Sequence, residues 1–425
     1  MNYFINFINK CRPRGVLFRR FKKERDVTFL KKASGPEAFP VRLFALYVLF
    51  YAGQSIYNTY FNLYLSSTGL TESQIGLIVS VSTVCLLAAQ LFWGIVSDRA
   101  SSKNGVLHLL YLAAALVSLC FYLGRSYWFL LLMGTAFAVF FNPLIPLQDN
   151  FVLEHLERSR WDYGQVRMGG TIGYCMTVLF IGFFLRDDYR PIFWMVALCM
   201  VGCRLLCIGL PKVRGYRAQG AKRPWRELLG NRTLIGLILF NLVFSIGMNF
   251  FYNFYSIYYV SDAVGGSSSL VGLMMFFSAV SEIPMLMLIH RMIKRLGIRG
   301  TLILAGCVTV LRWLLLAVLH QPAPILFVNL LHGMGYTGFS YCIITYIGKT
   351  MPHELRATGQ SLNALLGNVV SKVLFGFLGG FASQSFGADR IMLFSAGMMA
   401  AGTLVFAVWS RKRADVCKAG AGRLL

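Results

Sequence analysis

Charged residues are scarce in this chain of 425 residues: only 14% are Asp, Glu, Lys or Arg, whereas 56% are hydrophobic. A soluble domain usually carries roughly a quarter charged residues. Two kinds of site are missing as well. The sequence has no GxxxxGK[ST] loop for a nucleotide, and no His or acid accompanies Cys199, Cys203 and Cys207, which would share one helical face. We therefore expect neither a soluble fold nor an ATP-driven protein, and we expect no cofactor and no metal, the three cysteines being packing residues.

Long apolar runs make up most of the chain instead. A run of about 20 mainly apolar residues is long enough to cross a bilayer as a helix. Twelve such runs follow one another, at about 41–65, 73–97, 106–123, 127–155, 164–185, 191–210, 233–260, 268–290, 300–319, 323–348, 359–384 and 390–410. The fold class that they predict is an all-α membrane protein with twelve transmembrane helices.

Basic residues outnumber acidic ones by 41 to 17, and they gather in particular segments. The tail before the first apolar run, the segment 211–232 and the last residues are the richest in them. Because Lys and Arg accumulate in cytoplasmic loops, both termini are predicted to be cytoplasmic and the protein to lie in the inner cell membrane. The charge therefore indicates membrane topology rather than a nucleic-acid partner. The first 40 residues lack the apolar core of a cleavable signal peptide; this tail could lie on anionic lipid or be solvated.

The sequence repeats itself in two halves. YNTYFNLYL, which begins at Tyr57, returns as YNFYSIYYV at Tyr252, and Gly164-Gln165 returns at the same separation as Gly359-Gln360. Each half holds six apolar runs, so a parallel repeat about an axis along the membrane normal is predicted, as in transporters that rock one half against the other. The predicted divisions are a basic tail (1–40), a six-helix bundle (41–210), a linker (211–232), a second six-helix bundle (233–410) and a carboxyl tail (411–425).

A charged motif follows the second apolar run. The sequence GIVSDRASSK contains Gly94, Asp98, Arg99 and Lys103. A glycine permits close helix approach, and an acid with two cations can form a gating latch across a short turn; a basic loop that only fixes topology is the simpler alternative. The motif resembles the loop 2–3 signature of the major facilitator superfamily, with Ser101 where that family usually has glycine. The resemblance implies two pseudo-symmetric six-helix bundles around a central cavity.

An acid and a base flank the loop between the fourth and fifth runs. Asp149 and Arg167 lie at similar sequence distances from its centre, so antiparallel helices would bring both about two turns inside the membrane. Intramembrane charges tend to pair or to line an aqueous cavity, so we expect the two to face each other, at a substrate site or as a structural ion pair. DYGQVRMGGTIGY resembles the start of helix 5 in the lactose permease and phenylpropionate permease-like branch. The resemblance implies substrate binding by Asp149 and Arg167, with Tyr174 in place of a sugar-stacking Trp.

Three polar residues interrupt the second half: Glu282, Arg312 and His332. The lactose permease branch places an acid, an Arg and a His in these helices, where they carry the proton, and the resemblance implies that role here. Glu282 is the carrier that we favour, while His332 could be a packed core residue and Arg312 could simply neutralise Glu282. Lys372, in the eleventh run, could be a further counter-charge or could snorkel to the membrane surface.

Polar aromatic segments recur in the first and seventh runs. Tyr57 and Asn58 in one half have Tyr252 and Asn253 as counterparts in the other. Interfacial tyrosines would explain the rings, but an asparagine in both halves favours the lining of a cavity. Amphipathic rings of this kind suit sugars, nucleosides or aromatic acids.

Together these features predict a permease, a proton-coupled symporter of the plasma membrane that takes up a small polar or aromatic solute by alternating access, and not an enzyme. The expected partners are this solute, protons and the lipid bilayer, and we expect a monomer. Proton-driven export of drugs or metabolites is the main alternative. A membrane-embedded acyltransferase using His332 is less favoured because the sequence has no HxxxD motif, and a non-transporting sensor is a further alternative.

Overall fold

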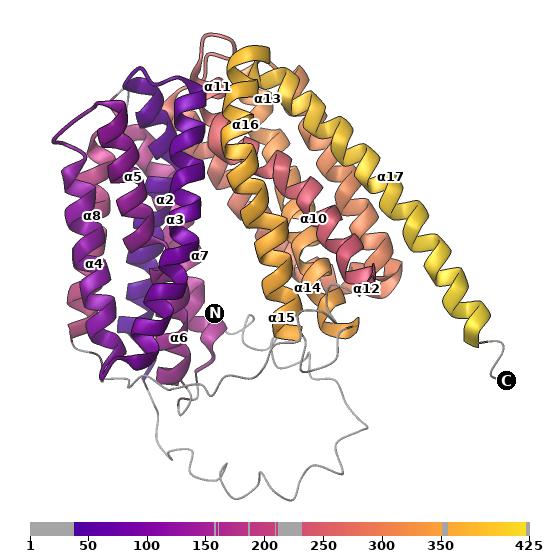
Figure 1. Ribbon diagram of the computed structural model, residues 1–425, viewed down its shortest axis with the longest axis horizontal. Coiled ribbons are helices and arrows are strands. Elements are labelled where there is room, and N and C mark those ends of the chain that lie inside the picture. Colours follow the sequence, from indigo (N-terminus) through magenta and orange to yellow (C-terminus); the bar gives the residue numbers. More distant parts are fainter. Residues whose placement is uncertain are drawn as a thin grey trace, which may run out of the picture.

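The protein is described by a computed structural model that covers residues 38–156, 159, 161–185, 188–208, 210, 232–350 and 356–421. Nearly all of the predicted amino-terminal tail and of the predicted linker lie outside the described residues. Every regular element within them is helical (Figure 1).

The helices of the first half form one group (Figure 1). They are α2 (Val41–Ser67), α3 (Glu72–Arg99), α4 (Lys103–Cys120), α5 (Tyr127–Phe141), α6 (Leu144–Leu156), α7 (Tyr163–Leu185) and α8 (Pro191–Ile208). Of these helices, α3 has a capping box at its start. The Thr71 hydroxyl accepts from the Gln74 backbone N–H, and the Gln74 side chain accepts from the Thr71 N–H, so a capping box fixes the start of α3.

The second half forms the other group and is more irregular. It contains α10 (Arg232–Phe250), η1 (Phe251–Tyr255), α11 (Ser256–Val260), α12 (Ser268–Val318), α13 (Pro322–Val328), η2 (Asn329–Leu331), η3 (Gly333–Gly338), α14 (Phe339–Thr350), α15 (Arg356–Asn363), η5 (Ala364–Val369), α16 (Val370–Phe386) and α17 (Ala388–Ala421). The segments η1, η3 and η5 are π-helical. Such turns are frequent at functional sites because they change which side chains face a given direction.

Most ends of the predicted apolar runs agree with these helices to within a few residues, but α17 continues to Ala421, beyond the end predicted at 410. Nine of the described helices are long and apolar enough to cross a membrane. Helix α12 has 51 residues and contains two predicted spans, which meet at Gly297 with φ 71° and ψ 168°. Glycine adopts this left-handed φ without steric cost, so the chain can turn there. Helix α2 and the segmented run from α13 to α14 are not among the nine, and the count of twelve spans stays a prediction.

The two groups meet along a seam at one end of the molecule. In Figure 1 they lie closest at the end that carries α11 and α13, and they diverge toward the end that carries α6 and α15. Close backbone approach forms the seam. A Cβ on Gly380 of α16 would lie 2.3 Å from the Glu72 carbonyl oxygen of α3, and one on Gly182 of α7 would lie 2.6 Å from the Ser268 carbonyl oxygen of α12.

Hydrogen bonds between the halves lie in the same region. The Asn62 amide donates to the Asn253 carbonyl oxygen at 3.0 Å, and the Tyr60 hydroxyl donates to the Ser268 carbonyl oxygen at 3.1 Å. The seam therefore closes the space between the bundles at the end opposite α6 and α15.

Candidate functional site

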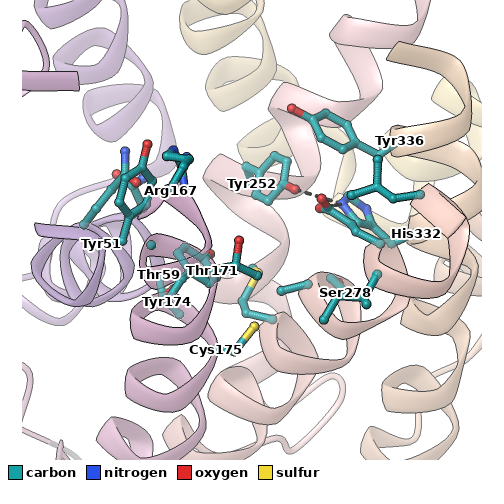
Figure 2. A pocket seen from close by; sticks show the side chains of 18 of the residues that line it. Tyr51, Thr59, Arg167, Thr171, Tyr174, Cys175, Tyr252, Ser278, His332 and Tyr336 are labelled. Atoms are coloured by element: carbon teal, nitrogen blue, oxygen red, sulfur yellow. Dashed lines mark hydrogen bonds and ion pairs between the residues drawn. The ribbon is translucent and has the colours of Figure 1, made fainter. Parts of the chain in front are cut away.

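A polar cavity of about 520 Å³ lies between the two bundles. The first half contributes side chains of α2 and α7, and the second half contributes side chains of α10, η1, α12, η3 and α16 together with His332 (Figure 2). The polar and titratable residues among them are Tyr51, Gln54, Asn58, Thr59, Arg167, Thr171, Tyr174, Cys175, Asn249, Tyr252, Asn253, Ser278, Glu282, His332, Tyr336 and Lys372. Most of the residues predicted to bind the solute thus surround one space.

Arg167 provides the positive charge of the amino-terminal wall. Its Cζ atom lies 3.9 Å from the ring centroid of Tyr51 and 5.4 Å from that of Tyr47. A guanidinium over an aromatic face is held by the ring quadrupole, and this contact is stronger where water is excluded. The sequence analysis did not predict that these two tyrosines contact Arg167. They lie four residues apart on α2 and so share one face of the helix, which is the feature that could have indicated the contact.

Asp149 does not touch Arg167 directly. Its Oδ1 accepts a hydrogen bond of 2.7 Å from the Tyr47 hydroxyl, and among the described residues it forms no ion pair within 4.0 Å. The expected face-to-face pair is corrected to a relay in which Tyr47 contacts both groups. Asp149 also lies behind this tyrosine rather than among the residues that line the cavity.

His332 lies on the opposite wall beside Tyr252 and Tyr336 (Figure 2). Together with Glu282 it forms the titratable pair of that wall. His332 Nε2 lies 3.4 Å from Glu282 Oε1 and 3.2 Å from the Tyr252 hydroxyl, and the Tyr336 ring stacks on the imidazole at 5.1 Å between centroids. The His332 side chain is 1% exposed, whereas that of Glu282 is 34% exposed. The carboxyl therefore faces the cavity and the imidazole supports it from behind.

Irregular backbone positions this wall. Tyr252 lies in η1, and His332 lies between η2 and η3, whose sequence GMGYTG is rich in glycine. A Cβ on Gly333 would lie 2.1 Å from the Ser281 carbonyl oxygen, so this glycine lets the chain pass next to α12 and brings His332 beside Glu282.

Arg312 lies outside the cavity lining. It is 1% exposed, its Nη2 donates to Asn329 Oδ1 at 2.7 Å, and its Cζ lies 4.2 Å from the Phe251 ring centroid. In the described part of the chain no acid pairs with it. The expectation that Arg312 neutralises Glu282 is therefore corrected: an amide and an aromatic ring hold the guanidinium, and His332 is the partner of the acid.

The paired Tyr-Asn segments line two spaces, and Asn58 and Asn253 border both of them. Asn58, Asn253 and Tyr252 line the central cavity, as does Tyr174. Tyr57 instead packs between Phe61 and Phe137, with ring centroids 4.4 Å and 4.2 Å away, beside a second cavity of about 90 Å³. Tyr57 is thus placed away from the central cavity, next to a smaller polar one.

The predicted latch is not assembled in this structure. Lys103 pairs with Glu154 of α6, and Asp98 and Arg99 are exposed without an ion pair to any described residue. A Cβ on Gly94 would meet no atom within 4 Å, so no helix approaches closely there. The expected contact of Asp98 with the two cations is corrected accordingly, and Glu154 is the acid that the sequence reasoning missed.

The chain is similar to known proteins both in sequence and in fold. Residues 41–394 match the MFS_1 like family. The chain is 25% identical over 396 residues to a maltose permease of Geobacillus stearothermophilus, covering 89% of this chain and 96% of that one. It is 26% identical over 320 residues to an Escherichia coli protein named "Probable 3-phenylpropionic acid transporter", covering 73% and 82%. The solved structure of the nucleoside transporter NupG superposes with a TM-score of 0.75 at 17% identity, over 87% of this chain and 98% of that one.

Proposed function

The chain belongs to the MFS_1 like family and is a membrane transporter of the major facilitator type, and on this premise we propose that it takes up a small polar or aromatic solute together with protons by alternating access. The single observation that carries the proposal is the Glu282–His332 pair, which faces a polar cavity between two matched bundles.

The position of the seam supports alternating access. Gly380 and Gly182 allow backbone contact between the halves at one end. At the other end a Cβ on Gly94 would meet no atom within 4 Å, and Asp98 forms no ion pair with a described residue. This arrangement suits a cavity that communicates with the predicted cytoplasmic side. Rocking of one bundle against the other would open the seam and engage the latch.

The chemistry of Glu282 supports proton coupling. Among the described residues it is the only acid that lines the central cavity, and its neighbour His332 can accept or donate a hydrogen bond according to its tautomer. Intramembrane ionisable groups that face a cavity typically form proton relays. A carboxyl that exchanges its proton with the cavity, and an imidazole that stabilises the ionised form, are sufficient for one proton per cycle.

The lining supports the proposed class of solute. Tyr174, Tyr252 and Tyr336 present apolar faces and hydroxyl groups, and Asn58 and Asn253 present amides. Such a lining binds the ring of a sugar, nucleoside or aromatic acid by stacking while it hydrogen-bonds to polar substituents. The names of the similar permeases fall in the same range of solutes.

Reconstitution in liposomes tests the proposal. The purified protein would be reconstituted in liposomes, and the external buffer would be made acidic relative to the interior. Accumulation of labelled maltose, 3-phenylpropionate and a nucleoside inside the liposomes would then be measured. We expect accumulation that collapses when a protonophore is added. Glu282→Gln should lose gradient-driven accumulation but retain solute exchange at equal pH, while Asp262→Asn, which removes an exposed acid outside the cavity, should retain both. Protonophore-insensitive uptake, or full accumulation by Glu282→Gln, would refute proton coupling through this residue.

A further inference from the structure

Lys372 is a cation of the cavity wall that has no role in the proton coupling described above. It lies near the start of α16, directly after the π-helical segment η5, and it lines both the central cavity and the smaller one. Within the described residues its ammonium group has neither an ion pair nor a hydrogen bond. A positive charge therefore faces the space between the bundles without a partner.

The position of Lys372 rules out a snorkelling role. The segments α15, η5 and α16 follow one another from Arg356 to Phe386, and Lys372 lies about four helical turns from either end. The lysine stem spans little more than one turn, so its head group cannot reach the membrane surface along the helix.

Two cations and one acid line the central cavity among the described residues. Arg167 and Lys372 are cations from opposite bundles, and Glu282 is the only acid among the described lining residues. Glu282 contacts His332. Asp149, which accepts a hydrogen bond from the Tyr47 hydroxyl, can offset the charge of Arg167 but not that of Lys372. Lys372 is exposed to the cavity and has no acidic partner among the described residues. Intramembrane ionisable groups that line a cavity mark substrate or ion pathways, which favours a ligand that brings a negative charge to this lysine.

We propose that the transported solute is an organic anion and that Lys372 holds its anionic group, with Arg167 facing the other part of the same space. This inference rests on the proposed transport function and narrows its solute class. A carboxylate bound by an ammonium group makes charge-assisted hydrogen bonds, which are about twice as strong as those between neutral groups. Tyr174 and Tyr252 would contact the organic body. A neutral sugar would leave the lysine unpaired.

Binding to the purified protein tests the inference without any transport step. Calorimetric titration would compare two matched pairs of probes: 3-phenylpropionate with 3-phenylpropionamide, and glucuronate with glucose. We expect at least one acid to bind about tenfold or more tightly than its neutral counterpart, the factor that corresponds to 1.4 kcal/mol. Lys372→Gln should remove this preference, and Lys372→Arg should restore most of it.

Arg291→Gln provides the matched control, because it removes one positive charge from an exposed position on α12. It should leave the preference for the acid unchanged. Equal affinity for acids and neutral counterparts, no binding of any acid at millimolar concentration, or an unchanged preference in Lys372→Gln would each overturn the inference.

The two proposals fail in distinguishable ways. Lysine-dependent binding of an acid without transport in liposomes would retain the anion site and refute the uptake function. Proton-driven uptake of a neutral solute by Lys372→Gln would retain the uptake function and refute the anion site.

Discussion

His332 Nε2 has two polar neighbours at the cavity wall, Glu282 Oε1 at 3.4 Å and the Tyr252 hydroxyl at 3.2 Å. A ring nitrogen either carries one proton or accepts one hydrogen bond, so it cannot serve both neighbours in the same way. With Glu282 ionised, a protonated Nε2 can donate to the carboxylate. With Glu282 protonated, a bare Nε2 can accept from either hydroxyl group. We therefore expect Tyr252 to tune the proton exchange of the pair.

Removal of this hydroxyl should slow transport more than it destabilises the fold. Tyr252→Phe keeps the ring and deletes one hydrogen bond, which is worth about 0.5–1.5 kcal/mol. We expect proton-driven uptake to fall by about two- to tenfold with little change in Tm. Tyr255→Phe is the control, because the Tyr255 hydroxyl donates to the Leu316 carbonyl oxygen away from the cavity. Tyr255→Phe should lower Tm and leave uptake by the folded protein unchanged. Unchanged uptake by Tyr252→Phe together with reduced uptake by Tyr255→Phe would show that the Tyr252 hydroxyl takes no part in proton coupling.

Arg167 should be essential for uptake but not for folding. Its guanidinium faces the cavity and stacks on Tyr51 at 3.9 Å, so its loss removes a solute contact rather than a core residue. Truncating a charged binding partner typically costs about 2–5 kcal/mol, so Arg167→Ala should reduce uptake by at least about thirtyfold. Size-exclusion profile and Tm should match the parent protein. Arg167→Lys should recover only part of the rate, because an ammonium lacks the planar guanidinium that stacks on the ring. Normal uptake by Arg167→Ala would remove this residue from the site.

The seam should open when a side chain is added at Gly380. A Cβ there would lie 2.3 Å from the Glu72 carbonyl oxygen, so Gly380→Val requires the backbones of α3 and α16 to separate. Cys175 lines the cavity and reports access to it. In a background without the other reactive cysteines, an impermeant thiol reagent added from the seam side should label Cys175 about tenfold faster, which corresponds to a shift of ~1.4 kcal/mol.

Gly105→Val controls for the valine itself, because a Cβ on Gly105 meets no atom within 4 Å. It should leave the labelling rate of Cys175 unchanged. Equal labelling of the Gly380 variant and the parent would show that the seam does not gate the cavity.

The ion pair between Lys103 and Glu154 should stabilise the first bundle. The Lys103 side chain is only 8% exposed, so loss of its partner would leave a poorly hydrated charge. Lys103→Met and Glu154→Gln should each lower Tm by about 2–4 °C, the shift expected for roughly 1 kcal/mol in a bundle of this size. The double variant should lose less than the sum of the two. Strict additivity would show that the pair contributes no coupling energy.

The sequence predicted the helices well because the membrane imposes a local rule. Backbone groups in lipid must be satisfied within each helix, so apolar length alone locates a span such as α7 or α8. Apolar length does not predict which side chains of a span face the cavity, and Tyr57 is an example. Neighbouring residues of one helix face different directions, and the sequence does not fix the rotation of the helix in its bundle. Asn58 faces the central cavity and Tyr57 does not.

Partners across long sequence distances were predicted less well. The sequence placed Asp149 and Arg167 at similar depth, but only the packing of α2 beside both α6 and α7 could bring Tyr47 to the two residues. In the same way, the glycine-rich η3 segment turned His332 toward Glu282 and left Arg312 to Asn329. Lys372 was visible in the sequence as an intramembrane cation, yet only the tertiary structure shows that no described residue pairs with it.

The amino-acid sequence by itself determined the helical membrane class, the order of the apolar segments and the matched halves of this protein, because these depend on local hydrophobicity and on charge in the loops. The tertiary structure decided which polar groups share the cavity, which are buried behind its walls and which end of the molecule is closed. Those outcomes depend on helix rotation, on π-helical turns that shift the facing side chains and on backbone contacts at glycine.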